Sequence, residues 1–104
     1  MFEYLIRVEL HDEHDYAAFH AAMAKRGFTR TITGDDGAVY DLPTGSYYAR
    51  TARGHEDVRT VVESAVAEMR REAEIVVART AGIVWSGLTP HTKTLGEMIL
   101  ALNR

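Results

Sequence analysis

Residues 2–10 read FEYLIRVEL, and apolar and polar side chains alternate along this stretch. One side of the backbone carries Phe2, Tyr4, Ile6, Val8 and Leu10. The other side carries Glu3, Leu5, Arg7 and Glu9. Because successive side chains of a strand point to opposite faces, this period of two predicts a strand with one buried face. The rest of the chain must therefore supply a layer that covers the apolar face.

A helix and three extended segments follow this strand. Apolar residues recur at helical spacing at Tyr16, Phe19 and Met23. The stretch Lys25-Arg26-Gly27, a basic turn followed by glycine, predicts the end of this helix. Glycine-containing turns then separate extended segments over residues 28–33, 39–42 and 46–52.

The second half of the chain contains the clearest helical stripe, formed by Val58, Val61, Val62, Ala65, Val66 and Met69. Acidic residues open this helix and a basic pair lies near its end, which suits the helix dipole. Residues 75–80 predict another strand, and residues 83–88 extend it or add a short fifth strand. Beyond Pro90, the spacing predicts a short C-terminal helix with Leu95, Met98, Ile99 and Leu102.

The order strand, helix, strand, strand, helix, strand predicts an α+β domain, a ferredoxin-like split βαβ sandwich (βαββαβ). We expect a four-stranded antiparallel sheet with both helices on one face, formed by residues 1–88. Residues 89–104 are expected to be a C-terminal extension that packs on this sheet or on a second copy. The expected core comprises Phe2, Ile6, Val8, Phe19, Met23, Val58, Val62 and Met69.

The composition is that of a single globular domain. The chain has 104 residues, of which 46% are hydrophobic and 26% charged, with no cysteine and a formal net charge of −3. The absence of cysteine excludes disulfides, a thiolate nucleophile and Cys-based metal sites. Charges interrupt the N-terminal apolar run, so we expect no signal peptide, no membrane span and a cytoplasmic location. The negative charge implies that any contact with nucleic acid is local.

Residues 27–51 read GFTRTITGDDGAVYDLPTGSYYART, with an aromatic residue at the start of a strand, an acidic glycine turn and an aromatic strand. With the order of the elements, residues 2–80 resemble the GhoS-type endoribonuclease antitoxins of type V toxin–antitoxin systems. The resemblance implies a ferredoxin-like protein that cleaves the messenger of a small membrane-active toxin. His20 stands where that family presents arginine as its candidate catalytic residue. Asp12 is nearest to the aspartate that ends the first strand in the related CRISPR-associated nucleases.

The stretch HDEHD at residues 11–15 has two readings. His11 and His14, with Asp12 or Asp15, could supply nitrogen and oxygen ligands to a metal. Their spacing matches no zinc motif of known mechanism, whereas Asp12 suits a helix N-cap and first-turn carboxylates favour the helix dipole. We therefore predict a helix start with no metal and no cofactor, and keep Asp12 as a candidate site residue.

His20 lies at the edge of the first helix's apolar stripe. It is either a half-exposed helix histidine or a general base for the 2′-hydroxyl of RNA. In the second case an arginine steadies the phosphate, and the candidates are Arg50, Arg53 and Arg30. Tyr48 and Arg50 share one side of a strand, and Arg7 lies on the polar side of the first strand. This arrangement favours either base stacking or ordinary strand packing.

The leading hypothesis is an RNA-directed regulatory protein, with endoribonuclease activity left open. The predicted catalytic residues are His20, Arg50 and Asp12, and the predicted RNA-binding residues are Arg7, Arg30, Tyr48 and Arg53. Single-stranded RNA is the expected partner, a homodimer is a further option, and no membrane contact is expected. The alternative is a non-catalytic ferredoxin-like module that binds a protein or itself.

Overall fold

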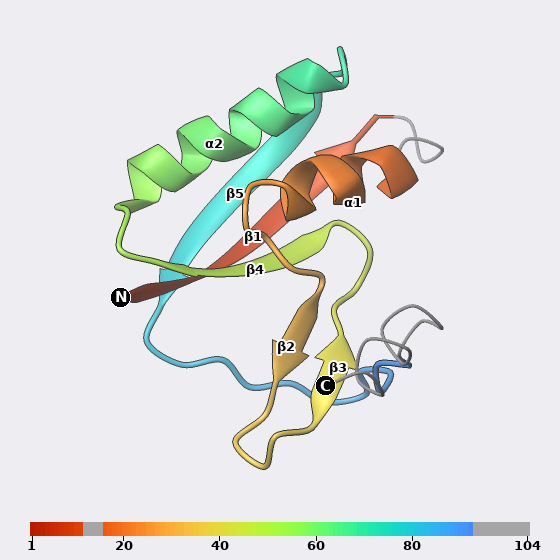
Figure 1. Cartoon of the computed structure of the whole chain (residues 1–104), viewed down its shortest axis with the longest axis vertical. Coiled ribbons are helices and arrows are strands. Elements are labelled where there is room, and N and C mark those ends of the chain that lie inside the picture. Colours follow the sequence, from red (N-terminus) through yellow and green to blue (C-terminus); the bar gives the residue numbers. More distant parts are fainter. Residues whose placement is uncertain (12–15, 93–104) are drawn as a thin grey trace, which may run out of the picture.

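The computed structural model describes residues 1–11 and 16–92 and shows an α+β fold (Figure 1). Its elements are β1 (Phe2–Leu10), α1 (Tyr16–Ala24), β2 (Thr31–Thr33), β3 (Val39–Asp41), β4 (Ser46–Thr51), α2 (His55–Glu68) and β5 (Ala73–Thr80). The predicted alternation of strands with two helices is confirmed.

The main sheet has β1 at its centre. The strand order is β4-β1-β5, and both neighbours run antiparallel to β1. Ile6 lies opposite Tyr47 of β4 and Val77 of β5, so these three side chains share one face. The neighbouring residue Leu5 lies opposite Tyr48 on the other face. The register thus divides each strand between two faces with different neighbours.

Both helices cover the face that carries Ile6 and Tyr47 (Figure 1). The largest fully buried side chains come from both helices and from two strands: Tyr4, Tyr47, Phe19, Ile6, Met23, Val8, Val58 and Val62. Phe2 and Met69, which were also expected in the core, are partly buried and pack against it. The buried face predicted from the alternation of residues 2–10 is therefore confirmed.

α1 ends through a backbone motif at Gly27. The Phe28 N–H donates to the Met23 carbonyl and the Gly27 N–H donates to the Ala24 carbonyl, each at a distance of 3.1 Å. Gly27 has a φ of +88°, which glycine adopts without strain because it has no Cβ. Phe28 and Met23 both belong to the core, so the predicted helix stop also returns the chain to the sheet.

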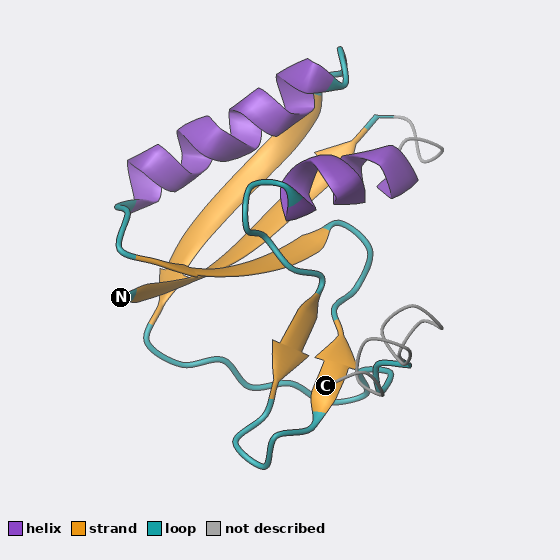
Figure 2. Cartoon of the chain, viewed as in Figure 1, coloured by secondary structure: helices purple, strands orange, loops and turns teal. Residues whose placement is uncertain are grey.

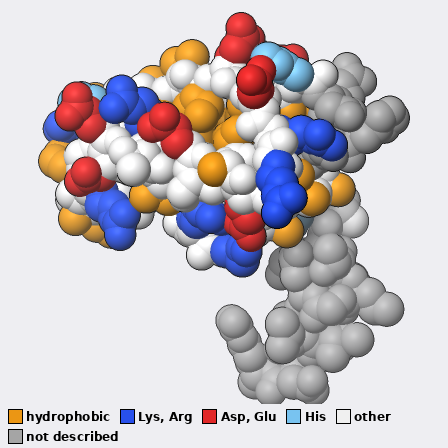
Figure 3. Space-filling view, turned by 90° about the horizontal axis from the view of Figure 1, so that it is seen from above, with side chains coloured by type: hydrophobic (Ala, Val, Ile, Leu, Met, Phe, Trp, Pro, Cys, Tyr) orange, Lys and Arg blue, Asp and Glu red, His pale blue; other side chains and the backbone are white. Residues whose placement is uncertain are grey.

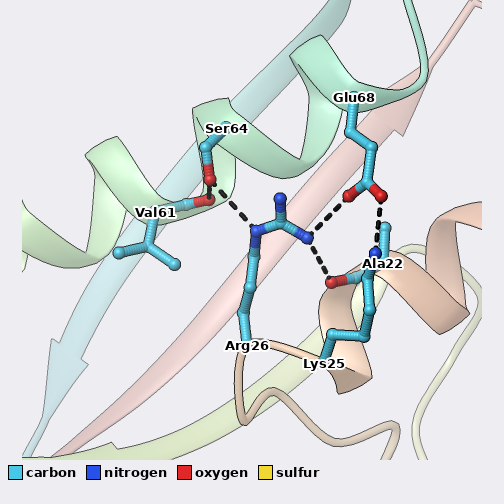
Figure 4. A network of polar contacts seen from close by, with 6 residues as sticks. All are labelled: Ala22, Lys25, Arg26, Val61, Ser64 and Glu68. Carbon is cyan, nitrogen blue, oxygen red and sulfur yellow. Dashed lines mark hydrogen bonds and ion pairs between the residues drawn. The ribbon is translucent and has the colours of Figure 1, made fainter.

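A polar network joins the end of α1 to α2 (Figure 4). Arg26 donates to the Ala22 carbonyl at 2.7 Å, to Glu68 at 2.9 Å and to Ser64 Oγ at 3.1 Å. Lys25 donates to the second carboxylate oxygen of Glu68 at 2.5 Å. Hydrogen bonds from these two cations hold the pKa of Glu68 below its ordinary value, and the bond from Lys25 has the larger effect. The network therefore ties the two helices together on the surface of the layer.

β2 and β3 leave the main sheet and form a separate antiparallel hairpin, in which Ile32 lies opposite Tyr40. The expectation of a four-stranded sheet was wrong, because the main sheet has three strands within the described residues. Only an isolated bridge between Thr29 and Tyr48 continues it beyond β4. The physical reason is that β2 pairs its backbone with β3, and β3 also pairs with the chain that follows β5.

That chain runs as a loop from β5 to the hairpin (Figure 2). Residues 83–88 were expected to extend β5 or to add a strand, and they do neither. Gly87 has a φ of +75°, a conformation that interrupts an extended strand.

The segment after this loop lies beside β3. The Asp41 N–H donates to the Thr89 carbonyl at 2.8 Å, and the His91 N–H donates to the Val39 carbonyl at 2.9 Å. The start of the predicted C-terminal extension thus joins the hairpin. The predicted C-terminal helix, with Leu95, Met98, Ile99 and Leu102, lies outside the described residues.

Candidate functional site

His20 lies where α1 meets β4, at the edge of the helix layer. α1 places Phe19 in the core and leaves the next residue, His20, half-buried. The Nδ1 atom of His20 shares a hydrogen bond of 2.7 Å with the hydroxyl of the fully buried Tyr47. The centroid of its ring lies 5.9 Å from that of Tyr16 and 5.7 Å from that of Tyr47. Two aromatic side chains therefore hold the imidazole in place.

The surroundings of His20 keep its imidazole neutral. Burial and, to a smaller extent, the positive charge of Arg30 lower the pKa of His20 from 6.5 to about 4. Burial raises the pKa of the Tyr47 hydroxyl, so this tyrosine stays protonated at neutral pH. In the tautomer whose Nδ1–H donates to Tyr47, Nε2 carries no proton and accepts one. The cluster therefore offers a neutral base beside a permanent positive charge.

Arg7 approaches the same end of β4 by folding over Gly45. Its Nη1 donates to the Val8 carbonyl at 2.8 Å, and its Nη2 pairs with Glu9. Gly45 has a φ of +86°, and a Cβ at this position would overlap Arg7 Nη1 and lie 2.6 Å from the Val8 carbonyl oxygen. Against the effect of burial, the charges of Arg30 and Arg7 act to lower the pKa of Tyr47. The absence of a side chain at Gly45 therefore lets the Arg7 guanidinium pack against the turn that precedes β4.

The opposite face of β4 presents Tyr48 and Arg50. The Tyr48 hydroxyl donates to Glu3 Oε1 at 2.6 Å, and Arg50 is exposed directly opposite Glu3 in the register. Burial and then the hydrogen bond to Glu3 raise the pKa of Tyr48 to about 12. The helices lie on the other side of the sheet, so this open face is free of them (Figure 1).

A groove of about 940 Å³ lies between the open face and the hairpin. Its sheet side is lined by Glu3, Tyr48 and Arg50, and its other sides by β2 and residues 81–85. Trp85 lines the groove with its ring 5.9 Å from that of Tyr40, as centroids. The groove is within the size range of small-ligand sites, about 300–1,000 Å³.

The structure separates the predicted site residues into two groups. In one group His20 contacts the Tyr47 hydroxyl, and the charges of Arg30 and Arg7 act on this tyrosine from a longer range. The other lies on the open face and comprises Tyr48 and Arg50. His20 and Arg50, which were predicted to act together, are not brought together. The reason is that Tyr47 and Arg50 point to opposite faces of the same strand.

Arg53 and Asp12 belong to neither group. Arg53 is exposed after β4, and its carbonyl accepts a hydrogen bond of 2.6 Å from the Tyr4 hydroxyl. Residues 12–15, weighed as a helix start or a metal site, lie outside the described residues. Within residues 1–11 and 16–92, no group of three or more histidine, aspartate or glutamate side chains is placed to hold a metal ion.

Sequence patterns did not single out Tyr47 and Trp85 as site residues. Strand alternation shows that Tyr47 and Tyr48 face opposite sides, but only the register shows which tyrosine meets the helices. Trp85 is the only tryptophan in the chain, and it lies in a loop between Gly82 and Gly87. The sequence signal that could have indicated Trp85 was an aromatic residue in a glycine-flanked loop. Its neighbours could not be inferred, because they come from a hairpin that is distant in the sequence.

Compared with known protein families the chain matches none, and a comparison with curated proteins found no match either. What the structure shares with the resemblance noted above is the α+β fold and the β-α-β…-α-β order of its elements. No family is therefore assigned. Neither of the helices described here is long and apolar enough to cross a membrane.

Proposed function

We propose that the chain is an RNA-directed regulatory protein that cleaves single-stranded RNA at His20. The observation that carries this proposal is the neutral imidazole, held by the buried Tyr47 hydroxyl and close to the charge of Arg30. A neutral imidazole can take the proton of a 2′-hydroxyl, and a guanidinium stabilises the charge that develops on the phosphate. The resemblance of residues 2–80 to GhoS-type antitoxins supports the same substrate class and a ferredoxin-like topology.

The distribution of charge supports a local contact with RNA. Acidic and basic side chains are interspersed over the helix side of the molecule (Figure 3), and the formal net charge is −3. Attraction by the overall field is therefore weak. The positive charge of Arg30 acts on both His20 and Tyr47, and that of Arg7 acts on Tyr47. Arg30 takes the role first considered for Arg50, because the sheet separates Arg50 from His20.

The proposed reaction is an internal transfer at one phosphate. Nε2 of His20 removes the proton of the 2′-hydroxyl, the oxygen attacks the adjacent phosphorus, and the 5′-oxygen leaves with a proton from water. The products are a 2′,3′-cyclic phosphate and a free 5′-hydroxyl. Arg30 faces the negative charge that grows on the phosphate oxygens. None of these steps uses a metal ion, so cleavage should survive a chelator.

The test uses the purified chain and single-stranded RNA in the presence of a chelator. His20→Ala should lower the cleavage rate by about 10²-fold or more, the scale expected for loss of a general base. His55→Ala is the matched control, because His55 is exposed at the start of α2. Arg30→Ala should also slow cleavage, whereas Arg59→Ala on the surface of α2 should not. Each variant must melt near the wild-type temperature.

The pH profile adds a second readout. Because the pKa of His20 is lowered to about 4, the rate should rise as pH increases through this value and then level off. An inflection near the ordinary histidine value of 6.5 would contradict a general base at His20 with this lowered pKa. RNA that stays intact with and without magnesium, and shows no salt-sensitive binding, would refute the proposal.

The second candidate is a non-catalytic module that associates with itself or a protein, and β5 favours it. Within residues 1–11 and 16–92, β5 is an edge strand of the main sheet, and Val76 at its centre is 62% exposed. An exposed apolar edge strand is a template for pairing with another strand. A concentration-dependent dimer that Val76→Lys dissolves, together with intact RNA, would favour this candidate over cleavage.

A further inference from the structure

The groove on the open face has a flat aromatic wall. Trp85 is partly exposed, and its ring lies beside Tyr40. Its Cζ2 is 3.5 Å from the position that a Cβ on Gly34 would take, so the indole is held close to the hairpin backbone. Ile32 and Ile83 also line the groove. This wall suits a planar group, because stacking on an aromatic face requires only a π-surface.

The facing wall is polar and rich in hydrogen-bond acceptors. Glu3 accepts a hydrogen bond from Tyr48 through Oε1, which leaves further acceptor capacity on its carboxylate. Arg50 lies opposite Glu3, and Asp35 lines the hairpin side. A planar ligand in this groove therefore meets carboxylate acceptors as well as guanidinium donors at its edges.

The charge of the groove limits what it holds. Its lining residues include two carboxylates, Glu3 and Asp35, and one guanidinium, Arg50. A run of phosphates would be repelled by the excess carboxylate. An uncharged planar group with hydrogen-bond donors on its edge fits better. Guanine is the natural base with two adjacent donors, N1–H and N2–H, which match the two oxygens of a carboxylate.

We infer that this groove binds an unpaired guanine base of single-stranded RNA, stacked on Trp85 and read by a carboxylate. The inference rests on the proposed function and adds a base-recognition site on the sheet face opposite His20. In this proposal Arg30 and Arg7 contact phosphates of the RNA, and the groove contacts one of its bases. Substrate preference and cleavage therefore depend on different side chains.

Trp85 reports on this site directly, because it is the only tryptophan. The probes are the 5′-monophosphates of guanosine, adenosine, cytidine and uridine, which share one phosphate and differ in the base. Excitation at the red edge of the tryptophan band avoids absorption by the nucleotides. Guanosine monophosphate should quench the fluorescence saturably and at the lowest concentration. Glu3→Gln should reduce the preference for guanosine over uridine while leaving the fold intact.

A second arm measures binding of a guanine-containing single-stranded RNA. Trp85→Leu should weaken binding by about 10-fold or more, the usual scale for one lost base stack. Val76→Ala is the control, because Val76 is exposed on the same face but does not line the groove. The melting temperature of Trp85→Leu must lie near that of the wild type. If this variant does not fold, the Glu3→Gln measurement still tests the groove.

The outcomes separate the two proposals. Equal quenching by all four monophosphates, or none, together with unchanged RNA binding by Trp85→Leu, overturns the groove inference and leaves cleavage at His20 intact. Saturable quenching by guanosine monophosphate, with RNA left uncut and His20→Ala without effect, supports the groove and overturns cleavage.

Discussion

Tyr47 and Tyr48 are neighbours in the chain and meet opposite environments. Tyr47 is fully buried under the helices, and its hydroxyl shares a hydrogen bond with His20. Tyr48 lies on the open face, with its hydroxyl on Glu3. β4 thus contributes side chains both to the half-buried cluster around His20 and to the open groove with charged walls. The comparison teaches that one strand can supply adjacent side chains to two separate environments, because adjacent residues cannot share a face.

The largest expected effect tests the difference in burial between the two tyrosines. Tyr47→Ala should lower the free energy of unfolding by about 3–5 kcal/mol, as for other large aromatic residues removed from a core. Tyr48→Ala should cost about 1 kcal/mol, since it loses mainly one hydrogen bond and partial packing. Denaturant unfolding of both variants measures the contrast. Equal losses would mean that the two faces are covered to a similar extent.

A smaller effect is expected at two glycines that share a φ of +86°. Gly45 lies against Arg7 and Val8 at the helix-covered end of β4, whereas a Cβ at Gly37 in the hairpin turn would meet nothing within 4 Å. Gly37→Ala should cost about 1 kcal/mol for the left-handed backbone alone. Gly45→Ala should cost about 2–3 kcal/mol, because the added Cβ must also displace the Arg7 guanidinium. Thermal unfolding with equal shifts for both variants would contradict this assignment.

The smallest effect concerns the pH dependence that His20 gives to folding. Its pKa is lowered to about 4 in the folded chain from 6.5, so the unfolded chain takes up the proton first on acidification. Stability should therefore fall as pH decreases from 6.5 towards about 4 and change no further through this group below that. The half-buried ring is partly screened by water, so the loss should be about 1 kcal/mol.

His20→Gln should remove this part of the pH dependence, because glutamine does not titrate. His55→Gln provides the control, since His55 is exposed and the change should leave the wild-type slope in place. Unfolding free energies measured at several pH values across the window give the comparison. A wild-type slope that survives in His20→Gln would assign the pH dependence to other groups.

Local patterns were enough to predict the elements that form the core. The alternation of residues 2–10 predicted β1 and its buried face, and the valine stripe predicted α2. Gly27 predicted the end of α1, where it adopts the left-handed conformation that such a stop requires. These features depend on the period of side-chain direction and on the backbone freedom of glycine, which are properties of short segments.

The tertiary structure decided which strands pair and which side chains become neighbours. Whether β2 joins the sheet or pairs with β3 depends on competition for backbone hydrogen bonds, and the segment after β5 contributes to that competition from about fifty residues away. The same long-range pairing places Trp85 over the open face and forms the groove. Likewise, Tyr47 rather than Arg50 meets His20 because the register of β4 on β1 selects the face that the helices cover. Side-chain period is a local property and was readable from the sequence alone. Strand register and pairing are set by the packing of the whole chain, and they determine which residues form each candidate site.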